Sequence, residues 1–104
     1  MQYRQKLEEL ESRFVSLTEQ MADPGVIGDP DSYRKTAKAH RDLEEIVAKY
    51  RDWKKAQSDL EGAREMLQET DEELRTMATE DVARLEPELV KIEEDLKILL
   101  LPKD

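Results

Sequence analysis

Cysteine is absent from this 104-residue sequence, and histidine occurs only once, as His40. Without cysteine the chain forms no disulfide, no thiolate metal site and no thiol nucleophile. One histidine alone builds neither a zinc site nor a catalytic triad. The three glycines are isolated from one another, so a glycine-rich phosphate loop is missing as well. We find no catalytic constellation, and we expect no metal, no cofactor and no small-molecule substrate.

Long apolar runs are also missing. The longest aliphatic run, Ile98–Leu101, is far too short to cross a bilayer. The first residues carry charges where a signal peptide has an apolar stretch. Acidic residues number 26 against 17 basic ones, which gives a formal net charge of −9. We therefore expect a cytoplasmic protein that makes no membrane contact.

The sequence does contain strong helical periodicity, which four prolines divide. Apolar residues recur every three or four positions at the start of the chain and predict a helix over about 1–22. The turn sequence within 23–28 ends this helix, and we expect a linker there. Asp29 is a good N-cap and Pro30 fits the first helical position. A very long second helix is therefore expected over about 30–69.

Two start signals follow the long helix. Thr70, with Glu73 three residues later, has the form of a capping box and predicts a short helix over 71–78. Thr79 is followed by acidic residues, which favour the positive end of a helix dipole. We therefore expect a last helix over about 80–100.

Pro87 lies inside this last helix and removes a backbone hydrogen bond to the Ala83 carbonyl. We expect a bend there, or a helix that begins only near Glu86. Together the segments predict an all-α fold. It is an antiparallel bundle of three main helices, one of them very long, plus a short helix, with coiled-coil-like packing in a single domain over 1–104. Apolar stripes of this spacing also suit pairing between chains, but we expect a monomer.

Charge is unevenly spread along the sequence. Residues 31–57 hold eight basic and five acidic side chains, in a chain that is otherwise acidic. Within this section a candidate contact for an RNA phosphate backbone consists of Arg34, Lys35, Lys38 and Arg41. The more common explanation of such a pattern is a solvated helix face. A pI of 4.7 argues against a free-standing nucleic-acid binder, so any RNA contact is expected to be local.

The remaining polar and aromatic residues favour ordinary structural roles. The acidic pairs fit solvated helix faces, because a helical di-iron site needs a Glu-x-x-His motif and Ala37 stands three residues before His40. A carboxylate metal enzyme is therefore a distant hypothesis. Trp53 and Tyr50 lie on the apolar stripe of the long helix, where core packing is the usual role and a partner hot spot is the alternative.

Several stretches of the sequence resemble the N-terminal helical domain of bacterial class I peptide chain release factors of type 1. The resemblance covers essentially all 104 residues. Its most specific part is the end of the sequence, which is similar to the segment that closes this domain in the family: Leu99, Leu100, Leu101, Pro102, Lys103 and Asp104. Other matching stretches are Met21–Pro24, Tyr50–Trp53, Asp59–Glu61, Ala63–Leu67 and Asp71–Ala78.

The resemblance implies a role in stop-codon-dependent termination of protein synthesis, in which the parent factor promotes hydrolysis of peptidyl-tRNA. It implies a non-catalytic domain that contacts the ribosome at the base of the large-subunit stalk, through rRNA and protein, and the GTPase release factor. The family's Gly-Gly-Gln and Pro-x-Thr tripeptides are absent from this sequence. We expect a piece excised from a longer protein, with 102–104 as the start of a linker to further domains.

A second hypothesis belongs to a different class. The chain would then be a free-standing coiled-coil adaptor or holdase that acts by self-association. Its apolar stripes would pair between chains rather than within one chain. The oligomeric state in solution discriminates between the two hypotheses.

Overall fold

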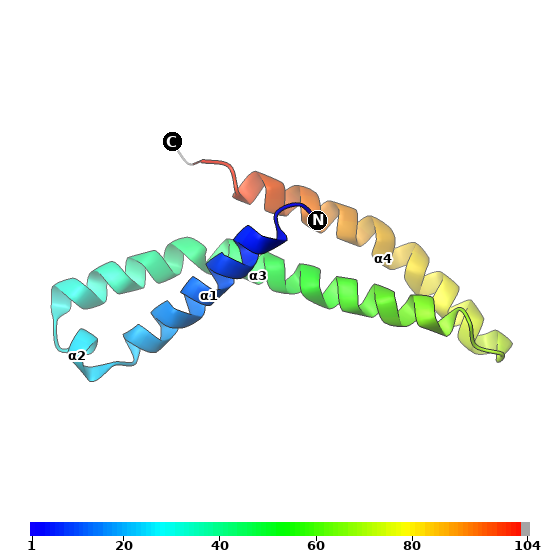
Figure 1. Ribbon diagram of the computed structural model, residues 1–104, viewed down its shortest axis with the longest axis horizontal. Coiled ribbons are helices and arrows are strands. Elements are labelled where there is room, and N and C mark those ends of the chain that lie inside the picture. Colours follow the sequence, from blue (N-terminus) through cyan, green and yellow to red (C-terminus); the bar gives the residue numbers. More distant parts are fainter. Residues whose placement is uncertain (103–104) are drawn as a thin grey trace. The chain divides into compact units, whose positions relative to one another are not determined.

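The computed structural model describes residues 1–102, and all regular secondary structure in that range is helical (Figure 1). The helices are α1 (Arg4–Met21), α2 (Pro24–Ile27), α3 (Pro30–Met66) and α4 (Glu72–Leu99). The predicted all-α class with one very long helix is confirmed. Among the described residues, no helix combines the length and the apolar character needed to cross a membrane.

The chain divides into two compact units, and their boundary falls inside α3, between Ala48 and Lys49. The first unit holds α1, α2 and the first part of α3. The second unit holds the rest of α3 and α4. A single domain over 1–104 stays a prediction.

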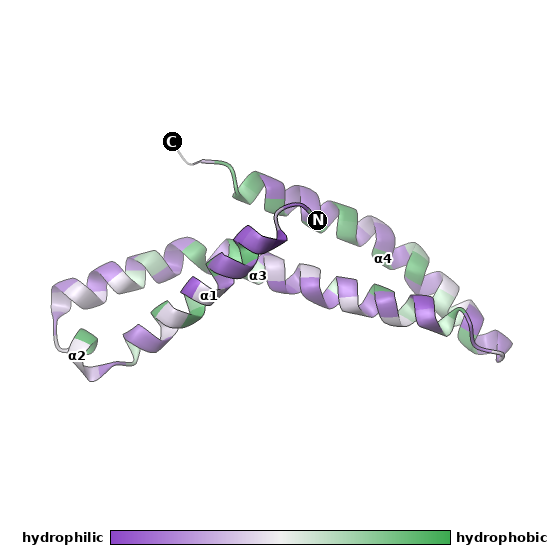
Figure 2. Ribbon diagram, in the orientation of Figure 1, coloured by the Kyte–Doolittle hydropathy of each residue, from purple (hydrophilic) through white to green (hydrophobic). Residues whose placement is uncertain are grey.

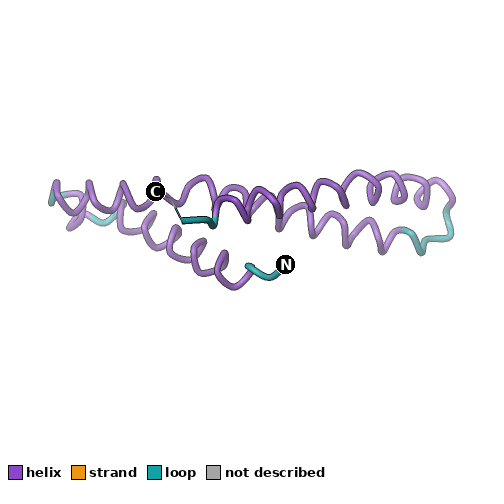
Figure 3. Tube along the Cα trace, turned by 90° about the horizontal axis from the view of Figure 1, so that it is seen from above, coloured by secondary structure: helices purple, strands orange, loops and turns teal. Residues whose placement is uncertain are grey.

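In the first unit, α1 lies beside the first part of α3, and the chain reverses through α2 (Figures 1 and 3). The ring of Phe14 on α1 stacks on His40 of α3, with ring centroids 4.2 Å apart. The predicted linker over 23–28 is corrected, because it contains the one-turn helix α2. The Asp23 carboxylate accepts a hydrogen bond from the Gly25 N–H at 2.7 Å, so Asp23 acts as an N-cap ahead of Pro24.

The second unit is an antiparallel helical hairpin. Lys49 on α3 pairs with Asp95 near the end of α4, whereas Met66 and Leu74 line one pocket beside the turn. Buried side chains recur at spacings of three, four or seven residues along the two helices, as in a coiled coil. On α3 these are Tyr50, Trp53, Ala56, Leu60 and Ala63, and on α4 they are Ala78, Leu85, Leu89, Ile92 and Leu96. Figure 2 shows apolar and polar residues alternating along both helices.

The predicted break between 71–78 and 80–100 is wrong, because α4 is one continuous helix. The Thr79 hydroxyl donates to the Arg75 carbonyl at 2.9 Å, which is the bond of a threonine inside a helix rather than at its start. Pro87 is exposed and the buried stripe keeps its spacing through it, so packing against α3 outweighs the lost hydrogen bond.

The N-cap of α4 is also corrected. Asp71, not Thr70, caps the helix, and its carboxylate accepts from the Glu73 N–H at 2.9 Å. The Asp29 cap of α3 is confirmed by hydrogen bonds from the N–H groups of Asp31 and Ser32. The remaining helix ends differ from the predicted ones by a few residues, as fraying ends commonly do.

Candidate functional site

The four candidate phosphate contacts lie on one exposed face of α3 in the first unit. This basic face consists of Arg34, Lys35, Lys38 and Arg41, all of which are exposed. Successive helical residues turn by about 100°, so the four side chains occupy an arc of about 120°. By the same geometry His40, which packs on α1, lies on the opposite side of α3. The basic face therefore points away from α1.

Acidic neighbours partly neutralise the basic face. Arg34 pairs with Asp31 at 3.5 Å, and Lys38 pairs with Asp42 at 3.1 Å. Exposed pairs of this kind are worth only about 0–1 kcal/mol, so a phosphate competes with them at little cost. Lys35 and Arg41 have no ion-pair partner within residues 1–102. These two cations are the most available for a phosphate.

The aromatic pair on α3 belongs to the core of the second unit, so the hot-spot alternative is excluded. Trp53 and Tyr50 are 3% and 0% exposed, and their rings stack with centroids 5.9 Å apart. The indole N–H of Trp53 donates to the Glu93 carboxylate on α4 at 3.0 Å. Trp53 and Tyr50 therefore stabilise the hairpin and do not form an exposed aromatic anchor for a partner.

A charged cluster beside this core joins the two helices of the hairpin. Asp95 accepts a hydrogen bond from Lys91 at 2.8 Å and lies 3.7 Å from the Lys49 amino group. The bond from Lys91 lowers the pKa of the Asp95 carboxyl below its ordinary value of 3.8. The same bond raises the pKa of Lys91 above 10.5. The cluster thus links Lys49 of α3 to Asp95 of α4 within the hairpin.

His40 has a packing role. The Thr18 hydroxyl donates its single proton to the Phe14 carbonyl at 3.0 Å, so it accepts the hydrogen bond from Nε2 of His40, also at 3.0 Å. Nδ1 of His40 lies 3.5 Å from the Glu44 carboxylate. Within residues 1–102, no three His, Asp or Glu side chains come together as metal ligands.

The junction segment ends α4 in an ordinary way. Leu99 is the last helical residue, and the N–H of Leu100 donates to the Leu96 carbonyl at 3.0 Å. Leu101 and Pro102 are exposed. The other two residues of the segment, Lys103 and Asp104, lie outside the described residues.

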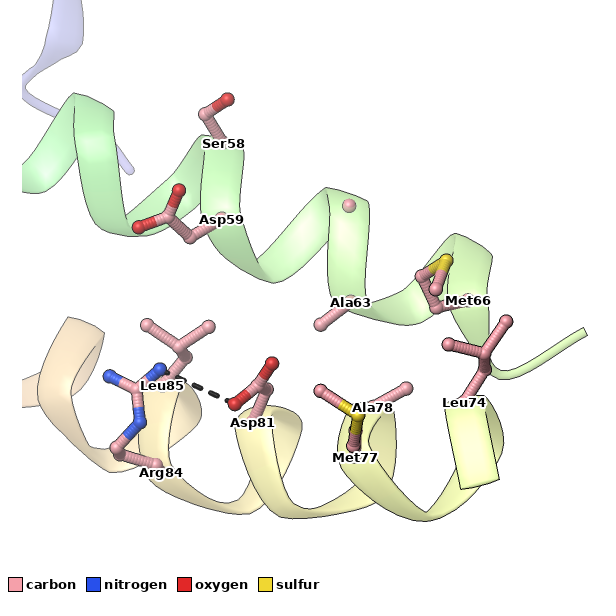
Figure 4. A pocket seen from close by; sticks show the side chains of 11 residues that line it. Ser58, Asp59, Ala63, Met66, Leu74, Met77, Ala78, Asp81, Arg84 and Leu85 are labelled. Carbon is pink, nitrogen blue, oxygen red and sulfur yellow. Dashed lines mark ion pairs between the residues drawn. The ribbon is translucent and has the colours of Figure 1, made fainter. Parts of the chain in front are cut away.

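A hollow between the end of α3 and the start of α4 was missed by sequence reasoning (Figure 4). This apolar groove has a volume of about 530 Å³. Its lining residues on α3 are Ser58, Asp59, Gly62, Ala63 and Met66, and on α4 they are Leu74, Met77, Ala78, Asp81, Arg84 and Leu85. The signal that could have found it is the pair of small residues, Ala63 and Ala78, at stripe positions where larger side chains would fill the space.

Comparison with known proteins points to one family. Residues 10–104 match the model of the PCRF domain. The chain is 49% identical over 100 residues to peptide chain release factor 1 of Acidobacterium capsulatum, and the match covers 96% of this chain and 28% of that protein. The protein of the same name from Maridesulfovibrio salexigens is 43% identical, with 95% and 28% covered. The chain thus spans about 28% of the length of these relatives. No solved structure matches it.

Proposed function

Because this chain belongs to the PCRF domain family, as found in peptide chain release factor 1, we propose that it acts in translation termination as the front part of such a factor. The parent factor would read a stop codon and promote hydrolysis of peptidyl-tRNA. The present sequence has no Gly-Gly-Gln tripeptide, so that chemistry would come from elsewhere in the factor. Its role is to bind and position, and it acts in the cytoplasm with the translation machinery.

The basic face of α3 is the proposed rRNA contact. The observation that supports it is the position of Lys35 and Arg41, which are exposed on the side of α3 opposite α1 and are not neutralised by an ion pair within 1–102. Each cation that neutralises a phosphate releases counterions and adds salt-dependent affinity. We propose that this contact is made at the stalk base of the large subunit, where the chain also meets protein and the GTPase release factor.

Charge reversal tests the contact. The double variant Lys35→Glu/Arg41→Glu is expected to bind purified ribosomes about tenfold more weakly at low salt, with a salt slope shallower by about 1 per lost phosphate contact. The matched control is Lys6→Glu/Arg13→Glu, which makes the same charge change at exposed positions of α1. Co-sedimentation at several salt concentrations measures both. Equal affinities for the two double variants would show that the basic face is only solvated.

A further inference from the structure

Small residues form part of the lining of the apolar groove of the second unit. Ala63 and Ala78 are buried there, and each contributes only a methyl group. Gly62 also lines the groove and has no side chain, and a Cβ placed there would meet nothing within 4 Å. A side chain can therefore be added at Gly62 without displacement of a neighbouring residue.

Flexible apolar side chains border the opening. Met77 is 59% exposed and Met66 is 36% exposed, and both line the groove together with Leu74 (Figure 4). Methionine is unbranched and polarizable, and it adapts to apolar groups of different shapes. Exposure of such side chains around a hollow costs free energy that an apolar occupant recovers.

Charge selects the kind of occupant. Residues 59–81, which form the end of the hairpin around the groove, hold nine acidic and only two basic side chains. On the groove itself, Arg84 pairs with Asp81 at 3.5 Å and with Glu88 at 3.6 Å, so its charge is compensated. A nucleic acid would be repelled by this surface, and so would the same end of a second copy. A basic partner is attracted.

We propose that this groove docks a basic amphipathic protein segment. One apolar side chain of the segment enters between Met66 and Met77, and its Lys and Arg residues face the acidic end of the hairpin. The inference rests on the proposed function in one respect, because the segment is presented by a protein of the ribosome. It assigns to the second unit a protein contact that is separate from the rRNA contact of the basic face.

The absence of cysteine allows a direct test. A single thiol introduced by Met77→Cys carries a photo-crosslinker at the groove, and Val90→Cys is the matched control, since Val90 is 58% exposed on the same helix but outside the groove. Each labelled chain is irradiated with purified ribosomes, and the attached peptides are sequenced. We expect Met77→Cys to link to a Lys- and Arg-rich protein segment with about tenfold higher yield than Val90→Cys.

A second variant places a charge at the groove without removing any core side chain. Gly62→Lys adds a long cation at a residue that lines the groove, where it repels a basic segment, and Ala83→Lys makes the same charge change at an exposed position of α4 outside the groove. Added to the Met77→Cys chain, Gly62→Lys is expected to lower the crosslink yield about tenfold, whereas Ala83→Lys leaves it within about twofold. Far-UV circular dichroism confirms that each variant is folded.

A third label, at Asp42→Cys, lies on the same exposed arc of α3 and keeps all four cations of the basic face, so it separates the groove contact from the proposed function. If Asp42→Cys links to rRNA while Met77→Cys links to nothing, to rRNA, to an acidic segment or to a second copy, the groove proposal is overturned and the proposed function stands. If none of the three labels links to the ribosome, both fail.

Discussion

Truncation of Trp53 should remove much of the stability of the second unit. A tryptophan side chain buries about 150–250 Å², and at about 25 cal/mol per Å² full burial is worth roughly 4–6 kcal/mol. That figure is an upper bound, because the unfolded chain already hides part of this surface. Trp53 is 3% exposed and stacks on Tyr50, so Trp53→Ala is expected to cost about 3–5 kcal/mol.

The indole hydrogen bond can be separated from the packing. Trp53→Phe keeps most of the apolar volume but leaves the half-buried Glu93 carboxylate without its 3.0 Å donor, which should cost about 1–3 kcal/mol. A double-mutant cycle with Glu93→Met, which removes the acceptor and keeps the length of the side chain, isolates the pair, and we expect a coupling energy of about 1 kcal/mol. If the coupling energy is zero, the stability lost in Trp53→Phe would come from the changed packing alone.

Urea unfolding followed by far-UV circular dichroism measures these free energies, since the variants lack the chain's only tryptophan. The control is Tyr33→Ala, in which an aromatic side chain that is 39% exposed is removed, with an expected cost below about 1 kcal/mol. A loss for Trp53→Ala no larger than that of the control would refute the assignment of Trp53 to the core. It would also return the partner hot spot to consideration.

Three further results are expected. Gly62→Ala should raise the free energy of unfolding by about 0.5–1 kcal/mol in thermal melts, because alanine favours the helix and its methyl group meets nothing; a loss would mean that the groove is narrower than described. Asp95→Asn should be less stable than the parent chain at neutral pH, and this difference in stability should vanish as the pH falls well below 3.8. The reason is that a carboxyl group with a lowered pKa contributes stability only while it is ionised. A constant difference from neutral to acidic pH would contradict this. Light scattering at two concentrations should give the mass of one chain, 12.2 kDa, whereas a dimer at both would favour the self-associating adaptor.

Local signals in the sequence place α1 and α3 well, but the same signal occurs at helices of very different length. The pair Asp29–Pro30 predicts a helix start, whereas the pair Asp23–Pro24, which has the same cap and the same first-turn proline, falls in the predicted linker. The first pair begins a helix of 37 residues and the second begins one of four. The cap signal marks where a helix starts, but only the packing of the residues after the cap decides how far the helix runs.

Tertiary packing explains the larger error in α4. Thr79 and Pro87 each carry a local signal for a boundary, and both lie on the exposed side of the helix. The buried residues from Ala78 to Leu96 continue in register against α3, and the burial of that stripe outweighs one lost backbone hydrogen bond. Signals that interrupt a helix are local, and they are overridden where an apolar stripe continues through them.

The candidate site was predictable only in part. The sequence shows that Arg34, Lys38 and Arg41 share a helix face, because helical spacing alone determines this. It does not show that Arg34 and Lys38 are held by Asp31 and Asp42, since which neighbour a flexible side chain contacts depends on its rotamer. The groove was missed for a related reason. A hollow between two helices depends on how the side chains of both helices meet, and the sequence does not give that arrangement.

The two proposed contacts are of opposite character, which suits a chain whose net charge is −9. That charge opposes long-range attraction to rRNA, so two cations on one face can act only at short range, once the chain has been brought close. In our proposal the acidic groove attracts a basic protein segment and so supplies attraction of the other sign. Two contacts joined in one chain support each other, because formation of the first raises the effective concentration of the second. Loss of either surface should therefore weaken binding to the ribosome by more than the affinity that this surface has on its own.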